Sequence, residues 1–139
     1  MRILMADDHA AMLAQAARLI GGTHEVVGTV ANGLELVEAA VRLDPDLIVL
    51  DISMPVLDGL EAARRLKQAG CRSRIVFLSV HEDPDYAAAA LAVGADAYVV
   101  KSRLASDLMP AISLALAARQ FVSPTITLPD RNGGENREP

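Results

Sequence analysis

The chain has 139 residues and a formal net charge of −5, with 52% hydrophobic and 22% charged residues. This size and composition predict one globular domain and exclude a disordered chain, a collagen-like chain and a coiled coil. The acidic charge disfavours a free-standing nucleic-acid binder, and the single cysteine, Cys71, allows neither an internal disulfide nor a cysteine metal cluster.

The N-terminal residues are not expected to form a targeting segment. Asp7 and Asp8 interrupt the first apolar run, which is too short for the apolar region of a signal peptide. No apolar run in the sequence approaches the length of a membrane span. We therefore expect a cytoplasmic protein with no membrane partner.

Short apolar runs recur along the chain at the spacing of strands that alternate with helices. Runs of four or five apolar residues rich in Val and Ile suit strands that are buried on both faces. Alanine- and leucine-rich stretches with helical spacing separate them. This alternation predicts an α/β fold with a parallel sheet and helices on both faces. The expected strands are residues 3–6, 26–30, 47–50, 75–78 and 97–100.

Several helix ends carry recognisable signals. Capping boxes, in which a polar side chain and a Glu three residues later share the first turn, mark two helix starts, and an Asp-Pro pair marks a third. Glycines fit the positions just after two helices. The residues are Asn32 with Glu35, Asp58 with Glu61, Asp83 with Pro84, and the glycines Gly70 and Gly94.

The last helix contains a conflict. Leu104, Leu108, Ile112 and Leu116 repeat every four residues, yet Pro110 falls inside the pattern. An interior proline removes a backbone hydrogen bond and clashes with the preceding turn. We expect this helix either to start late, near residue 106, or to be kinked at the proline.

The apolar pattern stops after Val122. The segment 123–139 holds three prolines, two adjacent glycines and mixed charges. We therefore assign residues 1–122 to the domain and 123–139 to a C-terminal tail or linker that is mostly mobile beyond Pro129.

Mostly polar residues follow four of the predicted strands where each strand ends. In an open parallel sheet, ligands bind at the carboxyl ends of the strands, so these side chains are expected to converge at one edge. They are Asp7 and Asp8 after the first strand, Asp51 after the third, Ser79, Val80 and His81 after the fourth, and Lys101 after the fifth.

This combination predicts phosphoryl-transfer chemistry. Three clustered carboxylates repel one another, and a divalent cation with hard oxygen ligands, favouring Mg²⁺, removes that penalty. A carboxylate nucleophile beside Mg²⁺, a lysine and a hydroxyl can accept and stabilise a phosphoryl group.

The motifs resemble those of the receiver domain of two-component response regulators, in the right order over residues 1 to about 122. They are Met5-Ala6-Asp7-Asp8-His9, Leu50-Asp51-Ile52-Ser53-Met54-Pro55, Asp58-Gly59, Leu78-Ser79 and Gly94-Ala95-Asp96-Ala97-Tyr98-Val99-Val100-Lys101. Asp7-Asp8-His9, Ser79-Val80-His81 and Phe121-Val122-Ser123-Pro124 are most similar to the NarL/LuxR-type branch, which usually carries a C-terminal helix-turn-helix. The resemblance implies a (βα)5 flavodoxin-like, doubly wound sheet of five strands in the order 2-1-3-4-5.

The resemblance also implies residue roles. Asp51 would be the phosphoacceptor, and Asp7, Asp8, Asp51 and the backbone carbonyl of Ser53 would bind Mg²⁺. Lys101 would pair with a phosphoryl oxygen. Ser79 would move to hydrogen-bond the phosphoryl group, and Tyr98 would turn inward behind it.

The implied partner is a sensor histidine kinase or histidine phosphotransferase. Phosphorylation would shift the surface formed by the fourth helix, fifth strand and fifth helix to control partner binding or homodimerisation. The chain would be a phosphoacceptor rather than a turnover enzyme, without direct nucleic-acid binding.

Two positions depart from the family pattern. Ser102 follows Lys101 where the family usually has a proline after a cis bond, and a cis bond before a non-proline costs about 2.5–4 kcal/mol. The bond is therefore either trans, with the lysine positioned differently, or cis and supported by the fold. Val80, where the family often has a smaller residue, is expected to narrow access to the site and slow autodephosphorylation.

Other interpretations stay open at this point. His9 and His81 are interpreted as surface histidines that flank the site, because no second histidine sits at ligand spacing. The chain could be the receiver part of a DNA-binding transcription regulator. A haloacid-dehalogenase-like phosphatase uses similar groups, but it needs a second aspartate two residues after the nucleophile, where this chain has Ser53.

Overall fold

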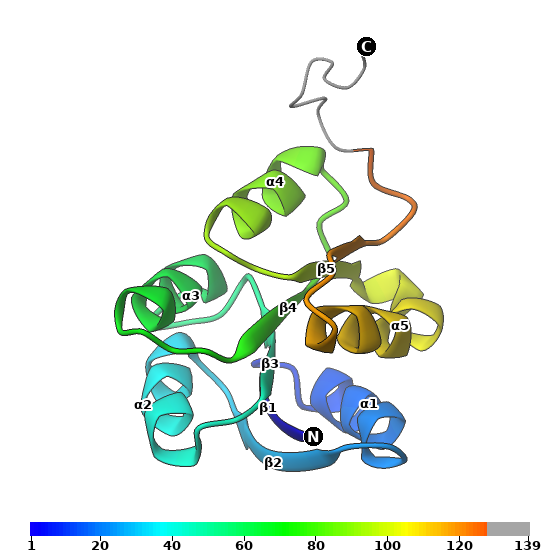
Figure 1. Cartoon of the computed structure of the whole chain (residues 1–139). Helices are drawn as coiled ribbons and strands as arrows, with labels where there is room; N and C mark the ends of the chain where they lie inside the picture. Colours follow the sequence, from blue (N-terminus) through cyan, green and yellow to red (C-terminus); the bar gives the residue numbers. More distant parts are fainter. Residues whose placement is uncertain (128–139) are drawn as a thin grey trace.

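A computed structural model describes residues 1–127 as a parallel sheet flanked by helices on both faces (Figure 1). In chain order the elements are β1 Arg2–Ala6, α1 Ala10–Gly21, β2 Glu25–Val30, α2 Gly33–Leu43, β3 Leu47–Asp51, α3 Gly59–Gln68, β4 Arg74–Ser79, α4 Pro84–Ala92, β5 Ala97–Val100, a 3₁₀ turn Lys101–Arg103, α5 Leu104–Leu116 and β6 Phe121–Val122. The α/β prediction is confirmed.

The strands are ordered β2-β1-β3-β4-β5-β6, and every pair is parallel. The predicted order 2-1-3-4-5 is therefore confirmed. A sixth, two-residue strand, not among those expected from the sequence, extends the sheet beside β5.

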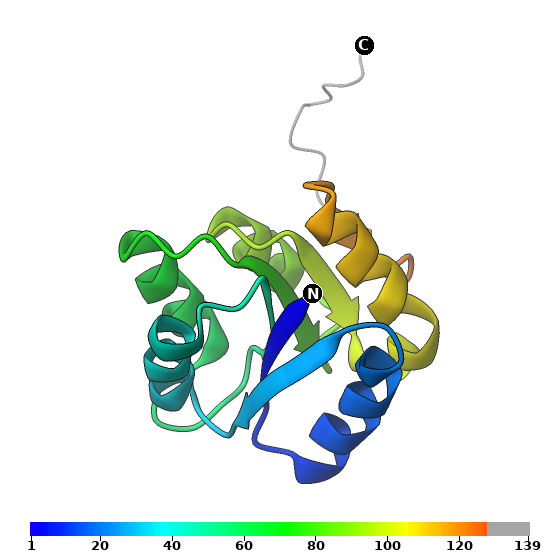
Figure 2. The ribbon, with the colours of Figure 1, turned by 60° about the horizontal axis from the view of Figure 1, so that its bottom comes forward.

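Two apolar layers cover the faces of the sheet. Helices α1 and α5 lie on one face, and α2, α3 and α4 lie on the other (Figures 1 and 2). Successive residues of each central strand alternate between the two layers, because strand side chains point to opposite faces in turn. In β1, for example, Ile3 and Met5 join the α1/α5 layer, while Leu4 joins the opposite layer. The continuous apolar runs follow from this burial on both sides.

The predicted helix caps are confirmed. Asn32 accepts a hydrogen bond from the backbone of Glu35 at 2.9 Å, and Asp58 accepts one from Glu61 at 2.8 Å. Asp83 caps α4, whose first residue is Pro84. Gly70 and Gly94 follow α3 and α4 with positive φ angles of 81° and 100°.

The late start predicted for the last helix is wrong. Helix α5 begins at Leu104, directly after the 3₁₀ turn, and runs through Pro110 without interruption. Pro110 is exposed, so its ring lies on the solvent side. The buried face of the helix, which includes Leu108 and Ile112, packs against the sheet and offsets the lost backbone hydrogen bond.

Packing against the domain continues past residue 122, the boundary expected from the sequence. Ser123 is fully buried, and Ile126 is 8% exposed and packs in the α2/α3/α4 layer. The Ser123 hydroxyl accepts a hydrogen bond from the Val100 N–H at 3.0 Å and donates one to Asp107 at 2.7 Å. These bonds attach the chain after β6 to β5 and α5. The mobile tail expected beyond Pro129 lies outside the described residues.

The buried carboxylate of Asp107 organises this attachment. Burial opposes its ionisation, but hydrogen bonds from Arg103, Ser123 and Ser106 outweigh that effect and lower the pKa of Asp107. The carboxylate is therefore the charged acceptor that holds the start of the C-terminal segment.

Among the helices of residues 1–127, none combines the length and the hydropathy of a membrane span.

We predict that Ser123→Ala lowers the free energy of unfolding by about 1–3 kcal/mol, because it leaves the buried Val100 N–H without an acceptor and removes one hydrogen bond to the buried Asp107 carboxylate. Urea unfolding measures the change. Ser113→Ala, an exposed serine on α5, is the matched control and should leave stability nearly unchanged. Equal stability of Ser123→Ala and wild type would show that the two hydrogen bonds of the Ser123 hydroxyl do not stabilise the fold.

Candidate functional site

The carboxyl ends of β1, β3 and β5 bring together a buried cluster of opposite charges. The Lys101 ammonium lies 2.8 Å from an oxygen of Asp7 and 2.9 Å from an oxygen of Asp51. All three side chains are at least nine-tenths buried, with exposures of 6%, 3% and 4% for Lys101, Asp7 and Asp51. The predicted convergence of these residues is therefore present in the structure.

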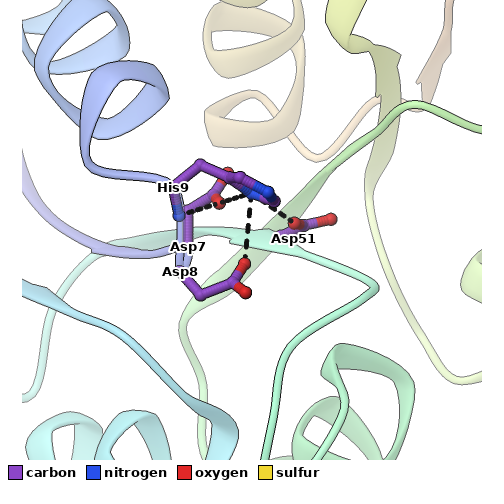
Figure 3. Close-up of side chains that lie close together, drawn as sticks. All are labelled: Asp7, Asp8, His9 and Asp51. Atoms are coloured by element: carbon purple, nitrogen blue, oxygen red, sulfur yellow. Dashed lines mark hydrogen bonds and ion pairs between the residues drawn. The ribbon is translucent and has the colours of Figure 1, made fainter.

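Asp8 and His9 complete the polar side of the cluster. Asp8 is one-third exposed, and the Nδ1 atom of His9 lies 3.1 Å from Asp7 and 3.2 Å from Asp8 (Figure 3). One donor atom from each of Asp7, Asp8, His9 and Asp51 lies within 4.8 Å of the others. His9 had been expected only to flank the site.

The charges of the cluster do not balance. Three carboxylates face one ammonium, which leaves two negative charges when His9 is neutral. Burial raises the pKa of Asp51, and the nearby charge of Asp7 adds to this, although Lys101 opposes both effects. Burial alone would lower the pKa of Lys101, but its ion pairs with Asp7 and Asp51 outweigh that and raise it. Two carboxylates thus compensate Lys101, whereas Asp51 shares the Lys101 ammonium with Asp7.

The residues present fit a divalent cation. Oδ2 of Asp7 is buried, and the Lys101 ammonium lies 2.8 Å from it. Because Asp51 shares that ammonium, the carboxylates keep negative charge that a divalent cation can neutralise. The donor set is dominated by carboxylate oxygens, which hard cations prefer.

The loop after β3 is fixed by close packing of its backbone. The N–H of Ser53 donates to Asp51 at 3.2 Å, and the N–H of Gly59 donates to the carbonyl of Ile52 at 2.7 Å. A side chain at Gly59 would collide with the carbonyl of Asp51. This explains why a glycine begins α3 directly behind the expected phosphoacceptor.

Two hydrogen bonds to the backbone of His81 fix the loop after β4. The N–H of His81 donates to the hydroxyl of Ser79 at 3.0 Å, and the hydroxyl of Tyr98 donates to the carbonyl of His81 at 2.8 Å. The His81 ring stacks on Tyr86 with centroids 4.0 Å apart, and its Nε2 atom lies 3.3 Å from the Ser53 hydroxyl. Tyr98, expected to turn inward on phosphorylation, is already fully buried here.

A hollow of about 270 Å³ opens beside the cluster. Its lining includes Val80, Lys101 and His9. Val80 is 66% exposed, so its side chain stands at the entrance rather than in the core. The Lys101–Ser102 bond is trans, as are all peptide bonds of the described residues, so Lys101 reaches Asp51 without the cis bond that is usual in the resembled family.

Comparisons with known proteins agree with this arrangement. The family model "Response regulator receiver domain" matches residues 3–113. The chain belongs to the response regulator receiver domain family. It is a phosphoacceptor signalling switch of the NarL/LuxR type, and the comparisons do not support the phosphatase alternative.

Among the relatives of this receiver domain is the nitrate/nitrite response regulator NarL of Escherichia coli K12, which is 37% identical over 127 residues. The uncharacterised transcriptional regulatory protein YvfU of Bacillus subtilis is 32% identical over 128 residues. These alignments cover 90% and 91% of this chain but only 59% and 64% of the relatives. The chain thus spans about three fifths of the length of these proteins.

Solved structures resemble the receiver domain over most of its length. A LuxR-family response regulator from Aurantimonas sp. SI85-9A1 has a TM-score of 0.85 at 34% identity, over 90% of this chain and 91% of that chain. The signal receiver domain of the putative response regulator NarL from Mycobacterium tuberculosis has a TM-score of 0.81 at 26% identity, over 85% and 97%.

We predict that Asp51→Asn is more stable than wild type at pH 7 when EDTA removes divalent cations. The raised pKa of Asp51 means that the folded state binds this proton more tightly than the unfolded state, so ionisation costs folding free energy as pH rises. The asparagine side chain is neutral at every pH and avoids this cost. The advantage should therefore shrink as pH falls and vanish below the unfolded pKa of about 3.9.

Urea unfolding of both proteins between about pH 4 and 8 tests this difference. Asp85→Asn, an exposed aspartate on α4, controls for the general effect of removing one negative charge. An Asp51→Asn protein that is less stable than wild type at pH 7, or whose advantage does not depend on pH, would contradict the charge imbalance.

Proposed function

We propose that Asp51 accepts the phosphoryl group and that Asp7, Asp8, Asp51 and the backbone carbonyl of Ser53 bind Mg²⁺. The observation that carries this proposal is the position of Asp51, buried at the end of β3 between Asp7 and the Lys101 ammonium. A carboxylate that shares its cation with a second acid remains a nucleophile, and a hollow lined by His9, Val80 and Lys101 opens beside the cluster.

The proposed step is a single displacement. An Asp51 carboxylate oxygen attacks the phosphorus of a phosphohistidine or of acetyl phosphate, a P–O bond forms, and the P–N or P–O bond to the leaving group breaks. Bound Mg²⁺ would supply positive charge to the phosphoryl oxygens and the carboxylates. Lys101, already 2.9 Å from Asp51, then pairs with a phosphoryl oxygen.

The switch is proposed to act through the loop after β4. When the Ser79 hydroxyl rotates to donate to a phosphoryl oxygen, the His81 N–H loses the acceptor that it has here. His81 then shifts, which alters its hydrogen bond from the Tyr98 hydroxyl and the stacking of its ring on Tyr86 of α4. A local charge change thereby alters the α4–β5–α5 surface.

Receiver domains of two-component systems interact with histidine kinases, and we propose a sensor histidine kinase or histidine phosphotransferase as the partner that delivers the phosphoryl group. Homodimerisation is a proposed output of the altered surface. The protein is proposed to act by changing partners rather than by turning over a substrate.

A second candidate function is transcription regulation by a longer protein that carries this receiver. It is favoured by the fact that the chain spans only 59% and 64% of two relatives named as response regulator and transcriptional regulatory protein. The complete reading frame decides it, because about 65 further residues with a helix-turn-helix pattern would supply the DNA-binding part.

Intact-mass measurement after incubation with Mg²⁺ and either acetyl phosphate or phosphoramidate tests the phosphoacceptor assignment. Phosphoramidate carries the P–N bond of a phosphohistidine. Wild type and Asp85→Asn should gain one phosphoryl group, and Asp51→Asn should gain none. Equal uptake by Asp51→Asn, or no uptake by wild type from either donor, would contradict the assignment.

We predict that Val80→Ala shortens the lifetime of the aspartyl phosphate roughly two- to tenfold, which is up to about 1.4 kcal/mol in the hydrolysis barrier. The smaller side chain widens the entrance of the hollow to water. Loss of the phosphoryl mass with time measures the lifetime, and Val41→Ala, an exposed valine on α2, is the control. A longer or unchanged lifetime in Val80→Ala would show that Val80 does not limit access.

A further inference from the structure

His9 contributes a nitrogen atom to an otherwise oxygen-rich cation site. Its Nδ1 atom lies 3.1 Å from Oδ1 of Asp7, 3.2 Å from Oδ1 of Asp8 and 4.0 Å from Oδ2 of Asp51 (Figure 3). The side chain is 66% exposed, so the ring is not buried for packing. Its position must therefore be explained by polar contacts.

The backbone directs the ring to this position. The N–H of His9 donates to Oδ1 of Asp7 at 2.9 Å, and the residue is the extended N-cap of α1, where its side chain makes no capping hydrogen bond. The ring is therefore free of a helix-capping role and lies over the carboxylates.

The separations match those of ligands around one ion. Two donors at right angles, each about 2.1 Å from an ion, are about 3 Å apart. The distances from Nδ1 to Asp7 and Asp8 are close to this value. In addition, the cluster places three carboxylates near one ammonium, that of Lys101, which lies 2.8 Å from Oδ2 of Asp7 and 2.9 Å from Oδ2 of Asp51.

We propose that His9 Nδ1 is a metal ligand and that this site prefers borderline transition-metal ions such as Ni²⁺, Co²⁺ and Cu²⁺ over Mg²⁺. Mg²⁺ takes oxygen ligands and gains little from imidazole, whereas borderline ions gain affinity from it. This inference rests on the cation site of the proposed function and specifies which ions that site takes.

The affinities for Ni²⁺ and Mg²⁺, measured by calorimetry at one fixed pH, test the proposal. The Met1 amino group lies 3.4 Å from Nδ1 of His24, which is a second place where nitrogen ligands meet. All proteins in the test therefore carry His24→Gln. His9→Gln should weaken Ni²⁺ binding by about tenfold or more and change Mg²⁺ binding by less than about threefold.

The matched control is His81→Gln, because His81 flanks the other side of the site through Ser53. It should leave the ratio of Ni²⁺ to Mg²⁺ affinity unchanged. Pulsed electron paramagnetic resonance of bound Cu²⁺, a borderline ion that takes imidazole ligands, gives a direct readout. A nitrogen coupling should be present in the parent and in His81→Gln, and absent in His9→Gln.

Each alternative outcome identifies what is wrong. Unchanged Ni²⁺ affinity in His9→Gln, or no nitrogen coupling in the parent, overturns the inference while phosphorylation of Asp51 stays intact. Tighter binding of both ions in His9→Gln shows that the imidazole competes with the cation as a hydrogen-bond donor, which also overturns it. Failure of the parent to bind either ion overturns the proposed cation site as well.

Discussion

The bridge from Lys101 to Asp7 and Asp51 is the interaction on which the site depends. A buried ammonium is held by two buried carboxylates at 2.8 and 2.9 Å, and neither acid has this cation to itself. Burying unbalanced charge lowers the free energy of unfolding, so this arrangement reduces the stability of the fold. It leaves a carboxylate nucleophile, a fixed positive charge and a place for a divalent cation at one edge of the sheet.

The strand order creates this bridge. Placing β3 between β1 and β4 brings the ends of β1 and β3 side by side, so that Asp7 and Asp51 become neighbours. Lys101 arrives from the far side, at the end of β5. Val100, the residue before Lys101, donates its backbone N–H to the hydroxyl of Ser123, and this bond joins β5 to the chain after β6. The C-terminal segment is therefore bonded to the residue next to Lys101, whose ammonium pairs with Asp51.

Local sequence signals predicted most of this fold because each is decided by near neighbours. Caps at Asn32 and Asp58 and the continuous apolar strands depend on residues within a few positions. The convergence of Asp7, Asp51 and Lys101 followed from the rule for parallel sheet edges.

What the sequence could not predict depends on contacts between distant residues. The burial of Ser123 requires Asp107 and Val100 as partners, which the composition of the tail does not reveal. The position of the His9 ring depends on the backbone conformation after β1. Val56, in the loop after β3, has a φ of 69°, a left-handed conformation that a β-branched residue rarely adopts and that no local signal indicates.

The most direct test is the free energy of unfolding with and without Mg²⁺, measured for wild type and Asp51→Asn. It shows whether the carboxylates of the cluster, Asp51 included, bind a divalent cation. The account predicts that Mg²⁺ at about one hundred times its dissociation constant stabilises wild type by about 2.7 kcal/mol and Asp51→Asn by clearly less. Equal stabilisation of the two proteins, or none of wild type, would contradict it.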